Sequence, residues 1–388
     1  MKIAVTGDSH LGRTLYGFDL TSNIRRTMYR FFRWCANQKV DAVVHLGDVG
    51  DRPVWSEHQQ KILIQWCNEF ERAELPLFLL TGNHDVLSKH GVASALDIIK
   101  TARHSFVNVV DRPQHIMIAT GKGVDWAMSE MLFLPFPSPS IYREDEDWIA
   151  DIKAAQSEIV DSCVCFAHLN VDGARMGEQE VIFRGADYTI PDRILDDDRI
   201  RLVVNGHIHK PQKVGKVLMP GAAERLNFSE RNNDVRFICI DTESLDVKKY
   251  KIKQAYSLIQ IDIDASGWAY ETPLTTEDVL ADLGDVPDNC LIKVQPFVDE
   301  QTTIDWPSVE NTLYNKDAVY VVIAPPVLAQ RKRKKSQGTL TSDSPMGLAK
   351  RFLRRRVHDK AERLALLKMF KRLQVSDSEK KTTTSASR

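Results

Sequence analysis

Five short polar clusters in this sequence combine residue types that bind metal ions, and each directly follows an apolar run. They are Asp8-Ser9-His10, Gly47-Asp48, Gly82-Asn83-His84-Asp85, His168 and Asn205-Gly206-His207-Ile208-His209. Carboxylates, imidazoles and an amide oxygen, with no thiolate, suit Mn²⁺ best, with Mg²⁺, Fe²⁺ or Zn²⁺ as alternatives. Two such ions about 3.5–4 Å apart can clamp a phosphate, activate a water and stabilise the leaving oxygen. The clusters therefore predict hydrolysis of a phosphate ester at a two-ion centre.

The spacing of these residues indicates how they could share two ions. Asp8 and His10 are two residues apart, so the loop between them lets both side chains reach one ion. Asp48, a lone carboxylate after a glycine, can bridge two ions through its two oxygens. Asn83 supplies a neutral carbonyl oxygen. The remaining imidazoles come from His168, His207 and His209.

Further polar residues beside these ligands could assist the reaction. His84 is not needed as a ligand, and it could protonate the leaving oxygen or stabilise the developing charge. Asp85 either orients His84 or caps the next turn, and Asp51 either supports a ligand or caps a helix. His45 lies inside a predicted strand, where we interpret it as a core histidine with a satisfied hydrogen bond.

The elements that must position these clusters are short strands alternating with helices. Apolar, β-rich runs occupy residues 3–7, 42–46, 77–81, 163–167 and 202–205. Residues 22–38 and 57–73 instead repeat apolar side chains at helical spacing. This alternation predicts an α/β domain with a largely parallel core sheet. Ligands of such sheets bind beyond the carboxyl ends of the strands, so the five clusters should converge at one edge.

Changes in pattern divide the chain into five segments. The first domain, residues 1–249, ends with hairpin strands predicted at 214–219 and 235–240. After it come a small β/α module (250–328), a basic linker (329–345), a helix with interleaved apolar residues and arginines (346–374) and a disordered tail (375–388). In the module, strands are predicted at 255–264, 290–298 and 318–326, and helices at 275–283 and 307–314.

Composition places the chain among ordinary globular proteins. Its 388 residues are 43% hydrophobic and 27% charged, and no apolar run is long enough for a membrane-spanning helix. Six cysteines without a CxxC pair predict reduced thiols and a cytoplasmic protein, in the host cytoplasm if a phage encodes it. The net charge of −1 is uneven, because residues 330–388 balance to +13 and the rest to −14. A basic tail on an acidic body suggests an anionic partner.

Three longer stretches point to a particular family. They are Asp8-Ser9-His10-Leu11-Gly12, residues 168–174 (HLNVDGA) and residues 219–230 (MPGAAERLNFSE). With the five clusters, they resemble the calcineurin-like metallophosphoesterases, and within these the SbcD-like nucleases of DNA double-strand-break repair and recombination. The resemblance implies a four-layer sandwich of mixed β-sheets flanked by helices. It also implies a small α/β capping domain that binds DNA, at residues 250–328, and C-terminal helices.

The same resemblance implies an assignment of the ligands. One ion would be held by Asp8, His10, Asp48 and His209. The second ion would be held by Asp48, Asn83, His168 and His207. His84 would act on the transition state. The implied enzyme is a Mn²⁺-dependent exonuclease and endonuclease that hydrolyses phosphodiester bonds at DNA ends.

The resemblance also implies protein partners. An ATPase of the SbcC type would dock its coiled coil on the helix at 346–374; the less favoured alternative is that this helix packs on its own chain. A homodimer would form through the helices at 22–38 and 57–73. The candidate contacts for this dimer are Phe31, Trp34 and Trp66. No membrane is implied.

Departures from the family pattern leave an alternative open. Gly50, Ala222 and Ser229 differ from the residues usual in the family, and none of them is a predicted ligand. Residues 47–53 (GDVGDRP) instead resemble the protein serine/threonine phosphatases, in which the arginine equivalent to Arg52 holds the substrate phosphate. A protein phosphatase or a small-molecule phosphodiesterase of the same fold is therefore the alternative function. A DNA-end-binding scaffold with a decayed site is disfavoured, because all seven ligand positions hold competent residues.

Overall fold

The computed structural model describes most of the chain in two compact units. The units are residues 1–329 and 330–388. The described residues are 1–86, 95–122, 125–176, 188–266, 274–328, 353, 366 and 369, and side chains are not described for 120–127. The predictions for the linker, the helix at 346–374 and the tail therefore lie almost entirely outside the described residues.

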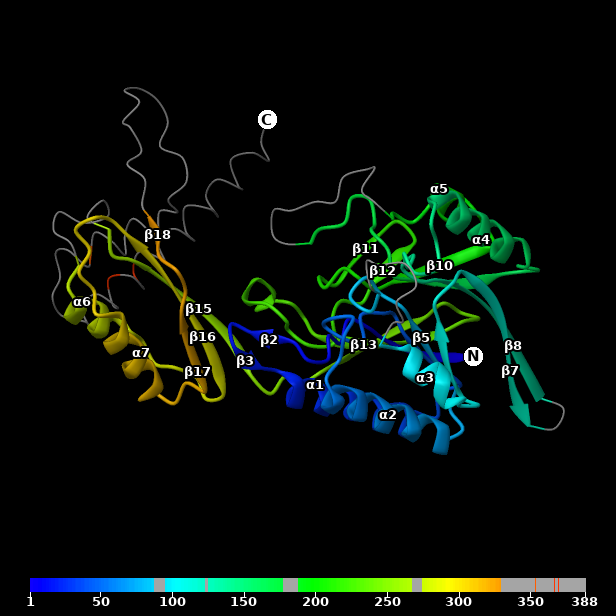
Figure 1. The fold of residues 1–388 in the computed structure, drawn as a ribbon, viewed down its shortest axis with the longest axis horizontal. Coiled ribbons are helices and arrows are strands. Elements are labelled where there is room, and N and C mark those ends of the chain that lie inside the picture. Colours follow the sequence, from blue (N-terminus) through cyan, green and yellow to red (C-terminus); the bar gives the residue numbers. More distant parts are fainter. Residues whose placement is uncertain are drawn as a thin grey trace, which may run out of the picture. The chain divides into compact units, whose positions relative to one another are not determined.

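Two six-stranded mixed sheets form the main body (Figure 1). The first has the order β14-β13-β1-β4-β5-β6, with strands Val247–Lys251, Arg236–Asp241, Lys2–Thr6, Ala42–His45, Leu77–Leu80 and Val107–Val110. The second has the order β11-β12-β10-β9-β8-β7, with strands Gln212–Val214, Val217–Met219, Ile200–Asn205, Cys163–Ala167, Asp125–Leu134 and Gln114–Lys122. In each sheet a parallel centre is extended by antiparallel outer strands.

Side-chain alternation along the strands explains why the two sheets stack. In β1, Ile3 and Val5 point into the core between the sheets, and Ala4 points to the core under the helices. In β9, Val164 belongs to the core between the sheets and Cys165 to the core under the second helical layer. Both faces of each sheet are therefore buried, and the order of layers is helix, sheet, sheet, helix.

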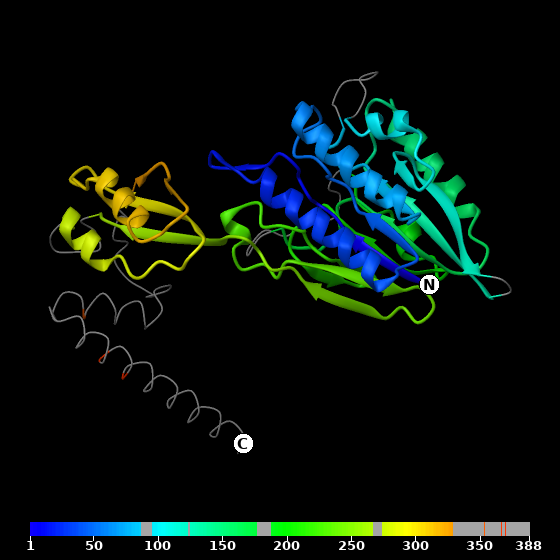
Figure 2. The same ribbon diagram turned by 90° about the horizontal axis from the view of Figure 1, so that it is seen from below.

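The helices of the outer layers begin and end at identifiable signals. Helix α1 (Thr21–Gln38) ends where Lys39 adopts a left-handed conformation, and α2 (Glu57–Arg72) begins with a capping box between Ser56 and Gln59. These two helices lie side by side on the first sheet (Figure 2). The other helices of the body are α3 (Asp97–Ala102), α4 (Asp145–Ser157), α5 (Asp192–Leu195) and the 3₁₀ turn η1 (Phe228–Glu230).

Residues 257–328 build a separate four-stranded parallel sheet. Its strands are β15 (Ser257–Asp264), β16 (Cys290–Val298), β17 (Tyr320–Ile323) and β18 (Val327–Leu328), and its helices are α6 (Thr276–Asp282) and α7 (Trp306–Tyr314). A short hairpin of the first domain, β2 (Thr14–Leu15) and β3 (Phe18–Asp19), contacts this sheet. There the hydroxyl of Tyr320 donates a hydrogen bond of 2.8 Å to the carbonyl of Tyr16.

The structure confirms the predicted strands and helices to within a few residues and corrects the predicted sheet. The five strands that carry the polar clusters belong to two sheets, three to the first and two to the second, and not to one largely parallel sheet. The mixed two-sheet sandwich implied by the family resemblance is the arrangement found. The sequence interpretation missed β6, β7, β8 and β14, although β8 ends in a buried apolar run, Met131 to Leu134.

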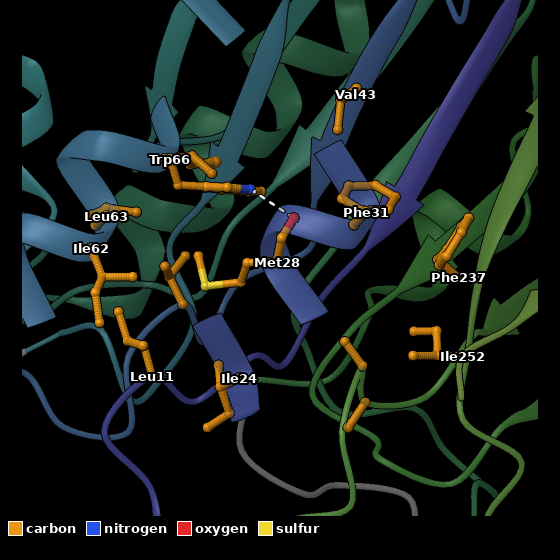
Figure 3. Close-up of a cluster of buried hydrophobic side chains, with 14 of the residues drawn as sticks. Leu11, Ile24, Met28, Phe31, Val43, Ile62, Leu63, Trp66, Phe237 and Ile252 are labelled. Carbon is orange, nitrogen blue, oxygen red and sulfur yellow. Dashed lines mark hydrogen bonds between the residues drawn. The ribbon is translucent and has the colours of Figure 1, made fainter. Parts of the chain in front are cut away.

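Two of the three candidate dimer contacts are wrong, because they lie in the core. Phe31 is 2% exposed and Trp66 is fully buried. The indole of Trp66 donates a hydrogen bond of 2.9 Å to the carbonyl of Met28, which ties α2 to α1 (Figure 3). Trp34 is half-buried, with its ring against Phe237 at 4.6 Å. The helical periodicity of these aromatic residues therefore results from packing of the helices on the sheet and not from a dimer contact.

The buried carboxyl of Glu224 makes stability depend on pH. It is 5% exposed, and burial raises its pKa to about 7, although the Thr27 hydroxyl donates a hydrogen bond to it. The folded state therefore binds this proton more tightly than the unfolded state, and stability falls as pH rises from about 4.5 through 7. We expect Glu224→Gln to remove a cost of about 2–3 kcal/mol at pH 8.

Thermal unfolding at two pH values tests this expectation. Glu224→Gln should raise the melting temperature by about 2–6 °C at pH 8 and by much less at pH 5. The exposed residue Glu243 offers the control Glu243→Gln, for which both values should match the unmodified protein. An equal change at pH 5 and pH 8 for Glu224→Gln would contradict the assignment of the ionised carboxylate as the cause.

Candidate metal centre

The loops that follow β1, β4, β5, β9 and β10 bring the seven predicted ligands together. Asp8, His10, Asp48 and His207 have positive φ angles of 49°, 47°, 51° and 67°. Residues other than glycine rarely adopt this conformation, and it is concentrated at functional sites. The backbone strain therefore falls on four of the residues whose chemistry singled them out in the sequence.

Two groups of donor atoms converge on neighbouring points. Asp8, His10 and His209 form one group, and Asp48, His168 and His207 form another, with ligand atoms within 4.8 Å of one another in each. The Oδ1 atom of Asn83 lies 2.9 Å from His207 Nδ1 and 3.1 Å from His168 Nε2, so it joins the second group. Each group could hold one divalent ion.

The carboxylate of Asp48 lies between the two groups. Its Oδ2 atom is 3.5 Å from His10 Nε2 and 3.3 Å from His168 Nε2. Its Oδ1 atom accepts a hydrogen bond of 2.8 Å from the backbone amide of His84. The side chain is 2% exposed, so water cannot replace it. Asp48 is the residue that could touch both ions.

Outer hydrogen bonds fix which nitrogen of each histidine faces the centre. The Nδ1–H of His168 donates to the carbonyl of Leu46 at 2.6 Å, and that of His209 donates to the Glu230 carboxylate at 2.9 Å. In His207 the two nitrogens exchange roles. Its Nε2 atom lies 3.1 Å from the Oδ1 atom of Asn170, and its Nδ1 atom faces the centre. In each ring the nitrogen that faces the centre is then free to donate its lone pair to a metal.

Asp48 and His168 form an ion pair inside the centre. Burial alone would lower the pKa of His168, but the adjacent Asp48 carboxylate outweighs burial and raises this pKa to about 9. Burial would likewise raise the pKa of Asp48, yet the imidazole of His168 and its neighbours hold it well below its usual range. The Asp48 carboxylate and the His168 imidazole thus stabilise each other's charged forms.

Three atoms indicate that a cation suits this site. Asp8 Oδ2 is buried and accepts no hydrogen bond among the described residues. The Nε2 atoms of His10 and His209 face each other at 3.2 Å, where two lone pairs repel unless a proton or a metal ion lies between them. Buried donors and lone pairs aimed at one point are costly without a ligand. The residues present therefore fit two divalent ions with mixed oxygen and nitrogen coordination.

Two glycines keep the space around the bridging carboxylate open. A Cβ atom on Gly82 would lie 2.2 Å from Asp48 Oδ1, and one on Gly47 would lie 2.5 Å from His168 Nδ1. Gly47 also has a φ of +101°, which other residues rarely adopt. These positions must be glycine for Asp48 and His168 to occupy the centre.

His84 lies beside the centre and is oriented from behind. Its Nδ1–H donates a hydrogen bond of 2.9 Å to the carbonyl of Asp51. Its ring centroid is 4.6 Å from that of His10, and one of its ring nitrogens lies within 4.8 Å of a ring nitrogen of His10 and a carboxylate oxygen of Asp48. The side chain is half-buried, so it can meet a substrate that reaches the ions.

The other predicted site residues take different places. Asp51 lies 3.3 Å from His10 Nδ1 and accepts a hydrogen bond of 3.1 Å from Arg13. Arg52 is exposed to solvent. Asp85 is buried and accepts hydrogen bonds from the amides of residues 49, 50 and 82, at 3.2, 3.0 and 2.9 Å. It therefore joins the second and third loops, a role that the sequence interpretation did not include.

The sequence interpretation also missed the partners behind the ligands. Glu230 supports His209, and Asn170 supports His207. Glu230 is the last residue of the stretch 219–230 that resembles the nucleases. The resemblance therefore included Glu230, but no role was predicted for it. His45 is confirmed as a core residue, since it is fully buried with its Nε2 atom 2.8 Å from the Ser9 hydroxyl.

Glu230 should matter for metal affinity without touching the ion. We expect Glu230→Gln to weaken Mn²⁺ binding about 10–100-fold, because the His209 ring loses its charged acceptor. Isothermal titration with Mn²⁺ would measure this change. The exposed residue Glu243 again offers a control, Glu243→Gln, that should bind as the unmodified protein does. Equal affinity for both variants would show that Glu230 does not support the centre.

Comparison with known proteins identifies the family of the catalytic body. The family model of calcineurin-like phosphoesterases matches residues 1–211. The chain belongs to this family. It is thus a phosphoesterase, a hydrolase of phosphoesters, and the clusters described above could hold the dimetal centre that the family uses.

Individual relatives of this phosphoesterase are more distant. The SbcD component of nuclease SbcCD from Rhodobacter capsulatus is 25% identical over 268 residues, which are 60% of this chain and 64% of that protein. The match thus covers less than two thirds of the relative. A solved archaeal phosphodiesterase is 13% identical, with a TM-score of 0.31 over 65% of this chain and all of that chain. A dimetal phosphatase from Danio rerio is 7% identical, with a TM-score of 0.37 over 65% of this chain and 99% of that chain.

Among the described residues, no helix combines the length and apolar character needed to cross a bilayer.

Proposed function

We propose that this phosphoesterase is a DNA nuclease subunit that hydrolyses phosphodiester bonds at DNA ends with two Mn²⁺ ions. The observation that carries the proposal is the position of Asp48 between two donor groups, with His84 attached to it through its backbone amide. Such a centre handles a poor leaving group. A sugar alkoxide needs more assistance to depart than an activated aryl oxide does, and His84 is positioned to give it.

The residues of the chain would divide the work as follows. When bound, the two ions would supply Lewis acidity and a water of lowered pKa. Asp8, His10, Asp48 and His209 would hold one ion, and Asp48, Asn83, His168 and His207 would hold the other. The bond from His84 Nδ1–H to the Asp51 carbonyl fixes the ring and leaves Nε2 for the substrate. Protonated Nε2 would then pass its proton to the departing 3′-oxygen or stabilise its charge.

DNA and the protein partners belong to the same proposal. The similarity to one component of nuclease SbcCD supports DNA as substrate, and it supports an SbcC-like ATPase that docks on residues 346–374. Residues 250–328 would contact the DNA. A homodimer through α1 and α2 also remains a prediction, and exposed side chains would have to form it, because Phe31 and Trp66 are buried.

The test is cleavage of end-labelled linear duplex and of a hairpin oligonucleotide. Purified protein should cut in Mn²⁺ and not in EDTA, at low ionic strength because phosphate binding weakens with salt. His84→Ala should reduce the cleavage rate about 10²–10³-fold. No cleavage of any DNA by protein that hydrolyses a phosphopeptide or a cyclic nucleotide would overturn the nuclease proposal.

A phosphatase remains the second candidate because of one residue. Arg52 is exposed and follows Asp51, whose carbonyl holds His84, so its guanidinium is free to reach a substrate phosphate near the centre. Substitution Arg52→Ala separates the two functions. A loss of phosphopeptide hydrolysis with unchanged DNA cleavage would show that Arg52 serves a phosphatase activity.

A further inference from the structure

One side of helix α1 carries a row of arginines, although the surrounding body is acidic. The helix contains four arginines and no aspartate or glutamate, whereas residues 1–329 balance to −14. Arg26, Arg30 and Arg33 are spaced by four and three residues, so they share one side of the helix. All three are exposed. The remaining one, Arg25, lies over the ring of Tyr29 on the side of α1 that faces α2.

Strand β14 extends this basic side. Residues 247–253 contain four lysines and no carboxylate. The strand contacts α1 directly, since the Tyr250 ring lies 4.4 Å from that of Trp34 and the Arg30 guanidinium donates to the carbonyl of Lys253 at 3.1 Å. Lys248 lies on the same face of the strand as Tyr250, because side chains alternate. The basic strip, as we call it, consists of Arg26, Arg30, Arg33, Lys248 and Lys253.

The charges of the basic strip are not neutralised by neighbours. Lys251 and Arg236 are excluded from it because both lie near Asp234, at 3.2 and 4.0 Å. Within the described part of the chain, none of the five members forms an ion pair with a carboxylate. The buried Glu224 is within electrostatic reach of Arg30, and its raised pKa of about 7 leaves it only partly ionised at neutral pH. The strip therefore presents close to five positive charges to solvent.

The direction of α1 relates the basic strip to the metal centre. Strands β1 and β4 are parallel, and the metal ligands follow their carboxyl ends. The helix that connects them must run back from that edge to the opposite edge of the sheet (Figure 1). From Arg26 to Arg33 it rises about 10 Å, which matches about three phosphates of one DNA strand. The strip thus leads away from the edge where the ligands lie.

We propose that the basic strip binds the phosphate backbone of DNA outside the metal centre. The inference rests on the proposed function, from which it takes DNA as the ligand. Five like charges in a row, with partly buried Trp34 and Tyr250 between them, complement a polyanion. They do not complement the same strip in a second copy, because symmetric pairing would bring the arginines together. A homodimer through α1 and α2 would therefore have to use another side of α1. The strip would add affinity without sequence preference and would hold the duplex beyond the bond that is cut.

The test measures DNA binding without catalysis. Full-length protein in EDTA is titrated into a fluorescent 30-base-pair duplex, and anisotropy is followed between 50 and 200 mM salt. Arg26→Gln/Arg30→Gln/Arg33→Gln should weaken binding at least 10-fold and reduce the salt slope by about 2–3, since each lost phosphate contact removes about 0.9. Exposed arginines elsewhere provide the matched control, Arg103→Gln/Arg112→Gln/Arg201→Gln, which should leave the slope unchanged. The basic tail is the same in all three proteins.

Three results would overturn the inference. The first is an equal salt slope for the strip variant and the control variant. The second is loss of a dimer by the strip variant in sedimentation with unchanged DNA binding, which would make the strip an interface between copies. The third is strip-dependent binding to phosphatidylserine vesicles in place of DNA. Metal-dependent cleavage is measured in a separate assay. Normal DNA binding by the strip variant would refute this inference and leave the proposed function untouched. Absence of cleavage by the unmodified protein would refute the proposed function and leave this inference untouched.

Discussion

Replacement of Asp48 by asparagine should abolish activity and reduce the metal content from two Mn²⁺ ions per chain to at most one. The amide keeps the size of the side chain but loses the negative charge, and only one of its two terminal atoms can coordinate. That change falls on the one group within 3.5 Å of nitrogens from both donor sets. We expect cleavage to fall by roughly 10³-fold or more, since both ions act on the same phosphate. Metal analysis after gel filtration and single-turnover cleavage measure the two effects.

Asp51→Asn is the matched control for this variant. Asp51 is also an aspartate at the same loop, but it contacts His10 from outside the centre at 3.3 Å. Loss of such a supporting group costs about 10–100-fold. If Asp48→Asn and Asp51→Asn had equal effects, or if Asp48→Asn retained two ions, Asp48 would not be the bridge.

Replacement of His84 by alanine should separate catalysis from metal binding. The imidazole is held by the Asp51 carbonyl, and it lies close to His10 and Asp48 although it is not one of the seven predicted ligands. We expect a loss of about 10²–10³-fold in the cleavage rate, because one general acid or one stabilising charge contributes that much. The Mn²⁺ content should remain at two. The same preparation of protein should be used for both measurements.

An exposed histidine provides the control for His84→Ala. His58 lies in the first turn of α2 and points to solvent, so His58→Ala should change neither quantity. A substrate with a better leaving group sharpens the result. The defect of His84→Ala should shrink for a phosphodiester that releases a nitrophenolate, and a defect of equal size on both substrates would refute assistance to the leaving oxygen.

The ligands could be predicted from sequence because chemistry and position coincide in them. Asp8, Asp48 and His168 each follow a short apolar strand, and the carboxyl ends of such strands gather ligands. Ligands gather at these strand ends whether the strands form one sheet or two. The structure therefore brings the predicted ligands together even though β1 and β9 belong to different sheets.

What the sequence could not reveal depends on contacts between distant segments. Glu230 carries no local mark of its bond to His209, and Asp85 joins loops 36 residues apart. Phe31 and Trp66 show a second limit of the sequence. An apolar periodicity predicts that one side of a helix is buried, but it does not reveal whether the chain's own core or a second copy covers that side. The basic strip was likewise hidden, because α1 and β14 are more than 200 residues apart in the chain.

The most direct test of the two-ion centre is electron paramagnetic resonance of the protein loaded with Mn²⁺. We expect two ions to bind per chain and their spectrum to show exchange coupling through a shared carboxylate. The coupling should disappear in Asp48→Asn. A single ion per chain, or two ions with the spectrum of isolated Mn²⁺, would contradict a centre bridged by Asp48.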